Sequence, residues 1–332
     1  MSSSDTLTHQ QKLAQLQRIA DAALGAYDLP SNPSATMINL SENATYRIDA
    51  GGEKWALRVH REGYHSRTAI GSELAWLQAL RQDGAVTTPV PHKGRNGEII
   101  QSIALPGLAP RHAVLFDWEA GAEPSEAELL GPFEVLGAAT ARMHIHARQW
   151  RRPGNFERMT WDFDGAFGKV QHWGSWRDGM GLDAEKTGLF QRTVDLIEKR
   201  LKAFGKGPER YGLIHCDMRL ANLLIDGDET KVIDFDDCGF SWYLYDGATA
   251  LSFIEHRPDV PELIRAWVKG YRSVAPLSAE DEHEIPTFVM FRRLLLVAWI
   301  GSHSETDLAK SLGVAYTRDT VALCEDYLAK YS

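Results

Sequence analysis

The spacing of apolar residues changes along the chain. Between residues 7 and 24 apolar side chains recur at helical intervals, and the stretch ends near Gly25 and Pro30, which predicts an amphipathic helix. Short apolar runs then alternate with turn residues such as Gly51 and Gly52, a pattern typical of antiparallel strands. We predict a small antiparallel sheet interrupted by one helix. The predicted strands are 37–40, 46–49, 55–59, the region of Val90, 99–102 and 113–116, and the helix is 70–80.

The pattern favours helices after residue 116. Acids and a glycine in residues 117–122 interrupt the strand pattern, and apolar residues then return at helical spacing. The run 291–300 is apolar on all sides except at two arginines, which indicates a mostly buried helix. The chain is therefore expected to have an α+β fold, with its strands concentrated before its helices. The predicted helices are 126–147, 185–204, 261–274, 280–302 and 317–331.

The composition is that of an ordinary globular protein. The chain has 332 residues, enough to bury a sizeable core in one large or two moderate domains. Its net charge of −9 favours neither nucleic acid nor an anionic membrane as a partner. The first residues lack the features of a signal peptide and no long uncharged apolar run is present, so we expect a cytoplasmic protein. Cys216 and Cys238 are expected to be small packing residues.

Two acidic segments carry the candidate chemistry. Residues 215–222 read His-Cys-Asp-Met-Arg-Leu-Ala-Asn, and residues 232–236 read Val-Ile-Asp-Phe-Asp. Transfer of a phosphoryl group from a nucleoside triphosphate needs a carboxylate to orient the acceptor hydroxyl and oxygen ligands to hold Mg²⁺. Asp217, Asn222 and Asp234 have the chemistry and the spacing for these tasks. The pattern therefore predicts an ATP-dependent and Mg²⁺-dependent phosphotransferase.

Asp and Asn are also common turn and cap residues, and this alternative could explain any one of the three. It does not explain the order of the whole region. The first acidic loop precedes a strand at 222–225, a turn at 226–228 and a second strand at 231–233, which leads into the second acidic loop. This order favours the phosphotransferase interpretation.

The pattern H-x-D-x-x-x-x-N, followed by a strand that ends in an acid, resembles the aminoglycoside phosphotransferase and choline kinase-like superfamily, which has a protein-kinase-like fold. The segments 57–60 and 234–237 are most similar to homoserine-kinase-like and hydroxylysine-kinase-like bacterial members. The resemblance implies a two-lobed fold with a small antiparallel-sheet N-lobe and a larger, mainly helical C-lobe. It places the N-lobe at 1–116, the hinge at 117–122 and the catalytic and substrate lobe at 123–332.

The resemblance also implies roles for five residues. Asp217 would accept or orient the proton of the acceptor hydroxyl, a task in which position matters more than basicity. Asn222 and Asp234 would hold Mg²⁺. His215 would support the loop from beneath, and Asp246 would accept hydrogen bonds from the loop backbone.

The N-lobe departs from a protein kinase in two ways. No G-x-G-x-x-G motif is present, and Ser41, Asn43 and Thr45 lie in the turn that would cover the phosphates, although an ordinary hairpin turn is the alternative. Arg58 stands where a phosphate-pairing lysine is expected, and Glu73 stands where the partner of that cation belongs. For Arg58 the alternative is an exposed cation on a solvated strand face. Two further residues of the expected nucleotide site lie next to the hinge, Phe116 and Trp118.

The acceptor is the least determined part, because one fold hosts many substrates. Arginines could recognise a carboxylate, acids an amine, and aromatic rings an apolar or cationic body. Taken singly, each such residue has an alternative role in the core or on the surface. The main substrate candidates are Arg219, Asp236, Asp237, Trp242 and Arg293, and further candidates are Trp161, Asp162, Tyr243, Arg292, Trp299 and His303.

Three functions compete at this point. The leading hypothesis is a kinase of a small hydroxyl compound, an amino acid or amino alcohol such as homoserine or hydroxylysine. The second is a serine/threonine protein kinase of the bacterial stress-response type, although no long segment ending in A-P-E lies between Asp234 and Asp246. The third is a non-catalytic nucleotide-binding pseudokinase, which the retention of the acidic residues disfavours. An aminoglycoside acceptor is also disfavoured, because few acids line the recognisable candidate pocket. The sequence does not indicate an oligomeric state.

Overall fold

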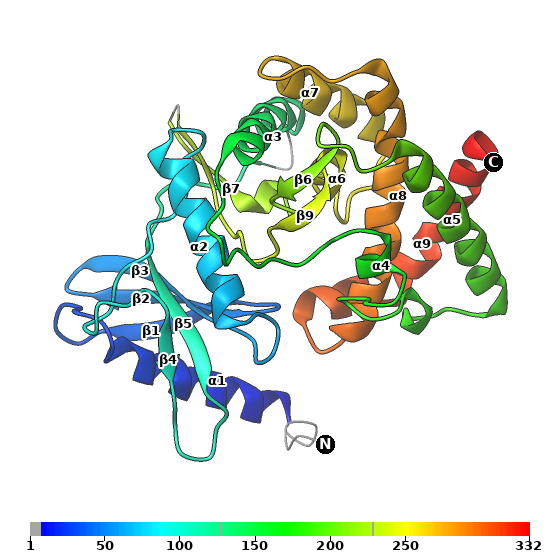
Figure 1. Ribbon diagram of the computed structural model, residues 1–332. Helices are drawn as coiled ribbons and strands as arrows, with labels where there is room; N and C mark the ends of the chain where they lie inside the picture. The colour runs from blue at the N-terminus through cyan, green and yellow to red at the C-terminus, as the bar shows by residue number, and fades with distance from the viewer. Residues whose placement is uncertain (1–7, 126–127, 228) are drawn as a thin grey trace. The chain divides into compact units, whose positions relative to one another are not determined.

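The computed structural model describes residues 8–125, 128–227 and 229–332 (Figure 1). These residues form two compact units. Unit 1 contains the described residues up to Gln78, with Pro89–Ala120 and Pro153–Glu157, and unit 2 contains Ala79–Thr88, Gly121–Arg152 and Arg158–Ser332. The fold is the expected two-lobed, protein-kinase-like one, with a small antiparallel sheet in the first unit and a mainly helical second unit.

Unit 1 is built on one five-stranded sheet. Its strands lie in the order β1-β2-β3-β5-β4, and each neighbouring pair is antiparallel. Alternate side chains of β2 are buried, as expected for a strand with one face against a core. The core also includes the buried side of α1, which begins with a capping box at Thr8. The elements are α1 (His9–Leu24), β1 (Ser34–Leu40), β2 (Ala44–Ala50), β3 (Glu53–Val59), α2 (Arg67–Gln82), β4 (Gln101–Ile103) and β5 (Arg111–Asp117), with the last turn of α2 counted in unit 2.

The strand predicted around Val90 does not form. Instead Pro91 makes an isolated bridge to Phe116. Prolines flank Val90 on both sides and have no N–H to donate, so this segment cannot take part in a regular ladder. The other predicted strands and the helix are present with shifted ends, and Leu7 of the predicted first helix lies outside the described residues.

Unit 2 combines long helices with two short antiparallel ribbons, β6 with β9 and β7 with β8 (Figure 1). The predicted helix 126–147 begins at residue 130 among the described residues, while 126 and 127 lie outside them, as does Asp228 of the predicted turn. The last helix is longer than predicted and is broken at Gly313. The helices are α3 (Leu130–Gln149), α4 (Phe163–Ala166), α5 (Ala184–Phe204), α6 (Tyr243–Thr249), α7 (Val260–Arg272), α8 (Ala279–Ser302) and α9 (Asp307–Tyr331), with 3₁₀ turns η1 (Trp176–Asp178) and η2 (Leu220–Asn222). The strands are β6 (Tyr211–Ile214), β7 (Leu223–Asp226), β8 (Glu229–Val232) and β9 (Gly239–Trp242).

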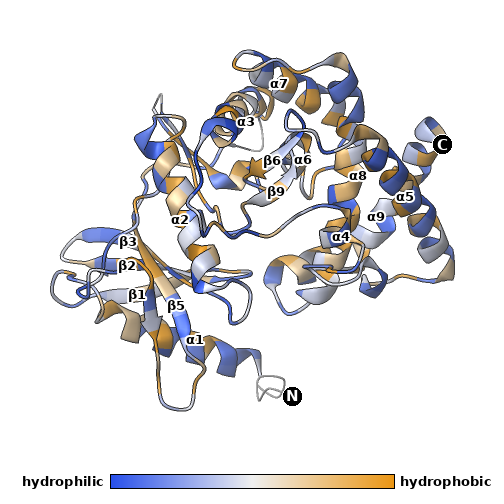
Figure 2. Cartoon of the chain, viewed as in Figure 1, coloured by the Kyte–Doolittle hydropathy of each residue, from blue (hydrophilic) through white to orange (hydrophobic). Residues whose placement is uncertain are grey.

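Helix α8 lies in the core of unit 2. Nearly every residue of 285–300 is buried, in contrast to α5, along which hydrophilic and hydrophobic residues alternate (Figure 2). Among the described residues α8 is the one helix long and apolar enough to cross a membrane, but 83% of that window is buried inside the protein. Its hydropathy is therefore explained by its place in the core.

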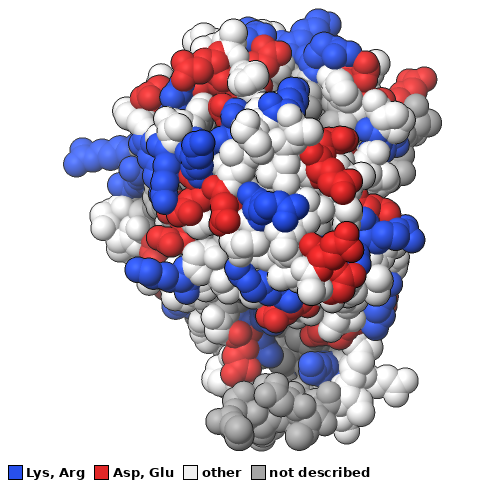
Figure 3. Space-filling model, turned by 90° about the vertical axis from the view of Figure 1, so that its right-hand side faces the viewer, with Lys and Arg blue, Asp and Glu red and all other residues white. Residues whose placement is uncertain are grey.

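The surface carries charges of both signs. On the face drawn in Figure 3, Lys and Arg side chains are interspersed with Asp and Glu. Some surface charges of the protein are paired along one helix, as Lys202 is with Glu198 at 2.7 Å on α5. Exposed pairs of this kind contribute little to stability, so the fold depends on its core packing.

Helices α3 and α7 approach closely because two glycines face the opposite backbone. A β-carbon at Gly137 would lie 2.0 Å from the Trp267 carbonyl oxygen, and one at Gly270 would lie 1.8 Å from the Glu134 carbonyl oxygen. Neither backbone oxygen can move without displacing its helix. The packing of these two helices therefore requires both glycines.

We predict that Gly270→Ala lowers the free energy of unfolding by about 2 kcal/mol or more, because the added methyl group overlaps the α3 backbone. The matched control is Gly188→Ala on α5, where nothing lies closer than 4.0 Å to the added carbon. There alanine should stabilise by about 0.5–1 kcal/mol, as in an open helical position. Denaturant unfolding of both variants tests this, and equal stability of the two would contradict the packing argument.

Candidate active site

The loop that follows β6 is held by one buried carboxylate. Asp246 of α6 accepts hydrogen bonds from the backbone N–H groups of His215 at 3.1 Å and Cys216 at 2.7 Å. Cys216 has a φ of 67°, a left-handed conformation that is costly for a residue with a side chain. The Met218 N–H donates to Thr249 Oγ1 at 2.8 Å. Helix α6 therefore fixes the unusual backbone that presents Asp217.

Asp246 is in turn held by a buried histidine of α3. His144 Nε2 lies 3.0 Å from Asp246 Oδ2, and its Nδ1 lies 3.1 Å from the Tyr271 hydroxyl. Burial lowers the pKa of His144, although Asp246 opposes this shift. A neutral ring would donate from Nε2 to the carboxylate and accept from Tyr271. His144 was not singled out from the sequence, where it is one histidine within a helical pattern.

His215 links the two acidic loops. Its Nε2 lies 3.0 Å from the Ile233 carbonyl oxygen, and its Nδ1 accepts from the Asp217 N–H at 3.3 Å. The ring also contacts that of Phe235, with centroids 4.5 Å apart. All three ring contacts are to the protein, so His215 connects the loop of Asp217 to the loop of Asp234.

The carboxylate of Asp217 is buried and accepts hydrogen bonds at both oxygens. Its Oδ2 accepts from Arg219 Nε at 3.1 Å and Asn222 Nδ2 at 3.0 Å, while its Oδ1 accepts from Arg292 Nη2 at 2.7 Å. Burial raises the pKa of Asp217, but Arg219, Arg292 and His215 together lower it below its ordinary value. The group is therefore a carboxylate at neutral pH, and it is held at both oxygens.

Asn222 and Asp234 are brought together by the backbone. The Ile233 N–H donates to the Asn222 carbonyl oxygen at 2.9 Å, which places the residue before Asp234 next to Asn222. Asp234 is half-buried and has a φ of 59°, again a left-handed conformation. The Nδ2 of Asn222 points toward Asp217 and donates to its backbone carbonyl oxygen at 2.8 Å as well as to its carboxylate. The opposite, amide oxygen of Asn222 is a hard ligand of the type that Mg²⁺ takes.

The candidate substrate acids lie in the turn after Asp234. The carbonyl oxygen of Asp236 accepts from the guanidinium of Arg158, and that of Asp237 accepts from Trp161 Nε1 at 2.8 Å. Arg158 also reaches the Cys238 carbonyl oxygen at 2.5 Å. The turn is thus fixed through its backbone carbonyl groups.

Two other substrate candidates lie in the core. Trp242 is 2% exposed and donates to the Gly205 carbonyl oxygen at 2.7 Å. Arg293 is fully buried and pairs with Glu255 at 2.8 Å. These contacts give both residues a structural role, so we leave them out of the acceptor site. The adjacent Arg292, considered from the sequence as a possible carboxylate binder, instead contacts Asp217.

In unit 1, Arg58 and Glu73 form a buried ion pair. Arg58 Nη1 lies 2.6 Å from Glu73 Oε1, and its guanidinium carbon lies 5.4 Å from the centroid of the Phe116 ring. Glu73 is completely buried, and its Oε2 has no hydrogen-bond partner among the described residues. The alternative of an exposed strand arginine is wrong, because Arg58 is only 8% exposed.

The turn between β1 and β2 is closed by its own hydrogen bonds. The Ser41 N–H donates to the Asn43 carbonyl oxygen at 3.0 Å, and Asn43 Oδ1 accepts from the Arg61 N–H at 3.0 Å. Thr45 is the second residue of β2, opposite Arg58 of β3. Trp118, just beyond β5, is exposed.

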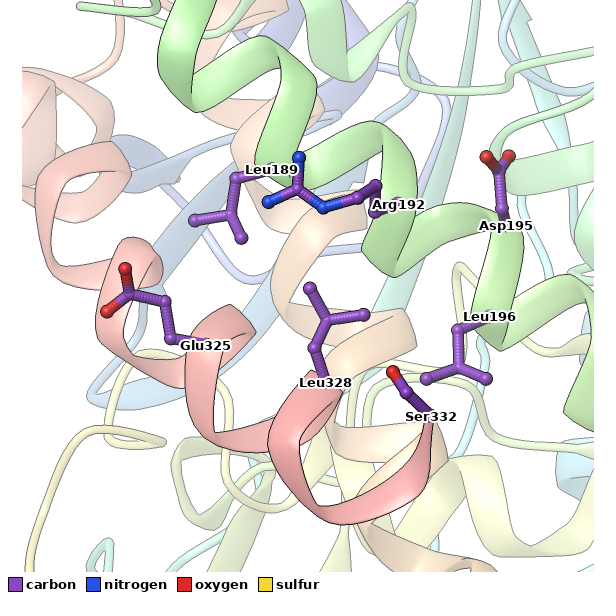
Figure 4. Close-up of a pocket in the computed structure, with 7 residues that line it drawn as sticks. All are labelled: Leu189, Arg192, Asp195, Leu196, Glu325, Leu328 and Ser332. Carbon is purple, nitrogen blue, oxygen red and sulfur yellow. The ribbon is translucent and has the colours of Figure 1, made fainter.

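A surface pocket lies between α5 and α9 (Figure 4). None of the predicted site residues lines it, so it is not part of the candidate site. Its lining consists of Leu189, Arg192, Asp195, Leu196, Glu325, Leu328 and Ser332.

The fold and the two acidic loops define a phosphotransferase with a protein-kinase-like fold. The phosphotransferase enzyme family APH matches residues 38–283, and the chain belongs to this family. It is a kinase that transfers phosphate to an alcohol group of a small molecule. Of the three functions considered from the sequence, this is the one that the comparisons support.

Three similar proteins illustrate the relationship. The solved structure of a microcompartment-associated aminopropanol kinase is 46% identical, with a TM-score of 0.88 over 94% of this chain and 98% of that chain. An amicoumacin kinase, solved in complex with AMP-PNP, Ca²⁺ and Ami, is 20% identical, with a TM-score of 0.76 over 96% of each chain. A homoserine kinase of Gluconobacter oxydans (strain 621H) is 24% identical over 90% of this chain and 93% of its own length.

We predict that Asp246→Asn lowers the free energy of unfolding by about 3 kcal/mol or more. The variant loses a buried charge, and its amide would point a donor at a donor N–H of the loop or of His144. The measurement is denaturant unfolding, with Asp326→Asn on the exposed side of α9 as the control, where the change should stay within about 0.5 kcal/mol. Stability of Asp246→Asn equal to that of the control would contradict this assignment of Asp246.

Proposed function

We propose that the protein transfers the γ-phosphate of ATP, with Mg²⁺, to the hydroxyl of a small amino alcohol of the aminopropanol class. The observation that carries this proposal is the 46% identity to an aminopropanol kinase over nearly the full length of both chains. Homoserine is the second candidate acceptor, because homoserine kinases match most of the chain at lower identity. The predicted cytoplasmic location remains a prediction.

In this proposal Asp217 orients the acceptor hydroxyl. The hydroxyl oxygen attacks the γ-phosphorus, the new O–P bond forms, and the bond between the γ-phosphorus and the bridging oxygen of the departing ADP breaks. The hydroxyl proton passes to the Asp217 carboxylate and then to solvent. A carboxylate with a lowered pKa suits a reaction in which bond breaking to the leaving group runs ahead and the base mainly positions the nucleophile.

The residues of the two loops fit a magnesium site. The carboxylate of Asp234 and the amide oxygen of Asn222 are hard oxygen donors, and the Ile233 to Asn222 hydrogen bond brings their loops together. When bound there, the ion would neutralise charge on the phosphates. The Ca²⁺ in the amicoumacin kinase complex agrees with the use of a divalent cation in this family.

For the nucleotide we propose Arg58 as the phosphate-binding cation and Glu73 as the residue that holds it. The contact at 2.6 Å holds the guanidinium, and a guanidinium is the side-chain group best suited to bind phosphate oxygens. Phe116 and Trp118, with Ser41, Asn43 and Thr45, remain the proposed nucleotide contacts of this lobe. The boundaries 1–116, 117–122 and 123–332 likewise remain proposals.

For the acceptor we propose that Asp236 or Asp237 meets the ammonium group of an amino alcohol. Both belong to the turn that Arg158 and Trp161 hold through backbone carbonyl groups, so the turn has a defined place in unit 2. Arg219 is paired with Asp217, and its role would be to hold that carboxylate and not to bind the acceptor.

The acceptor is tested by measuring ADP release with Mg²⁺-ATP and a panel of aminopropanols, ethanolamine, choline, homoserine, hydroxylysine, an aminoglycoside and a seryl peptide. We expect turnover with an aminopropanol. Asp217→Asn should lower kcat by about 10²- to 10⁴-fold with little change in nucleotide affinity, since the oxygen that orients the hydroxyl is altered. Preference for homoserine would shift the proposal to the amino acid, and unchanged turnover in Asp217→Asn would remove Asp217 from its role.

The metal assignment is tested by nucleotide binding to Asp234→Ala with Mg²⁺ and with EDTA. The variant should bind ATP more weakly than the wild type when Mg²⁺ is present, because a carboxylate ligand is lost. In EDTA the two proteins should bind ATP alike. An unaltered affinity in Mg²⁺ would count against Asp234 as a metal ligand.

A further inference from the structure

The buried guanidinium of Arg292 reaches the carboxylate of Asp217 from the middle of α8. All three of its nitrogen atoms donate to defined partners: Nη2 to Asp217 Oδ1 at 2.7 Å, Nη1 to the Tyr245 hydroxyl at 3.1 Å and Nε to Ser252 Oγ at 2.9 Å. The side chain is 3% exposed. Helix α8 lies far along the chain from both acidic loops, so neither motif predicts this contact.

The partners of Arg292 are themselves fixed. Ser252 Oγ donates to the Thr249 carbonyl oxygen at 2.7 Å, and the Tyr245 ring packs edge-on against Phe291 with centroids 5.4 Å apart. The Trp173 ring lies 5.1 Å from the guanidinium carbon. The planar guanidinium of Arg292 is therefore held in one position, and its hydrogen bond to Asp217 holds the carboxylate in a defined orientation.

The hydrogen bonds around Asp217 distinguish its two oxygens. A carboxylate offers about four acceptor positions, two on each oxygen. Among the described residues, Oδ2 accepts from both Arg219 and Asn222, whereas Oδ1 accepts from Arg292 alone. The oxygen with capacity left for one more donor is therefore the one that Arg292 holds.

We infer that Arg292 is a positioning residue that fixes Oδ1 of Asp217 as the oxygen to which the acceptor hydroxyl donates. The inference rests on the proposed role of Asp217 and adds to it which oxygen is used and what holds it. Phosphoryl transfer depends chiefly on placing the nucleophile in line, so a small rotation of the carboxylate should cost rate and not nucleotide binding.

The test compares kcat and KM of the full-length wild type with Arg292→Lys and Arg292→Ala, using the acceptor found active with wild type. Lysine keeps the charge but cannot reach three separate acceptors as the planar fork does. We expect kcat to fall about 10-fold for lysine and about 10²-fold for alanine, the loss that follows a misplacement of about 1 Å. KM for ATP should stay within about twofold, since the hydrogen bonds of the Arg292 guanidinium go to Asp217, Tyr245 and Ser252, and none of these is a proposed nucleotide residue.

Chemical rescue separates positioning from general damage. Adding guanidinium ion at non-denaturing, millimolar concentration to Arg292→Ala should restore part of kcat, because the ion can occupy the vacated site beside Oδ1. The control is Arg200→Lys, which weakens another ion pair to α8, that of Arg200 with Glu284 at 2.5 Å. Its kcat should stay within about twofold of the wild type, and guanidinium should not raise it.

If Arg292→Ala does not fold, Tyr245→Phe and Arg292→Lys carry the test. Removing the Tyr245 hydroxyl frees one arm of the guanidinium and should lower kcat by a few-fold at constant KM for ATP. If the wild type is active and the kcat of Arg292→Lys lies within twofold of the wild-type value, the inference is overturned. It is also overturned if the substitution changes only the KM for ATP. Absence of turnover in the wild type itself would instead contradict the proposed function.

Discussion

The site depends on the buried carboxylate of Asp246. Its two oxygens accept hydrogen bonds from the backbone N–H groups of His215 and Cys216, and the imidazole of His144 contacts one of them. These bonds help to offset the cost of the left-handed backbone at Cys216, which is of order 1–3 kcal/mol. The direction of Asp217 follows from that backbone. Through Asp246, the packing of α6 in unit 2 therefore determines the geometry of the loop that carries Asp217.

Buried acids recur in this molecule, and most of them have cationic partners. Asp217 is paired with Arg219 and Arg292, Glu255 with Arg293, and Glu73 with Arg58. An unpaired buried charge is expensive, so these partners are needed before the acids can serve any function. One oxygen of Glu73 has no hydrogen-bond partner within the described part of the chain, so its pairing with Arg58 is the main compensation for its burial.

The sequence predicted the elements and residues that have a regular spacing. Alternation in β2 and β3, helical periodicity in α5 and α8, and the spacing of Asp217, Asn222 and Asp234 are local properties of the chain. The ribbon of β6 and β9 and the short helix α6 escaped prediction, because they are short and buried and so lack a polar face that would reveal their period. The strand predicted near Val90 failed because flanking prolines override its apolar character.

The contacts of His144 and Arg292 could not be predicted, because they depend on which helices meet. In α8 two adjacent arginines point about 100° apart around the helix axis, as successive residues of an α-helix do. Arg292 therefore meets Asp217, while Arg293 meets Glu255 and also reaches Thr320 at 2.7 Å and the Tyr316 carbonyl oxygen at 2.9 Å on α9.

Apolar packing alone would let α8 rotate or slide, since the hydrophobic effect has no direction. Two buried ion pairs on different sides of α8, Arg292 with Asp217 and Arg293 with Glu255, fix both its rotation about the helix axis and its position along that axis. Because Arg293 also donates hydrogen bonds to α9, this C-terminal helix helps to fix the position of α8. The position of the Asp217 carboxylate thus depends on a part of the chain that follows residue 283, the last residue that the family matches.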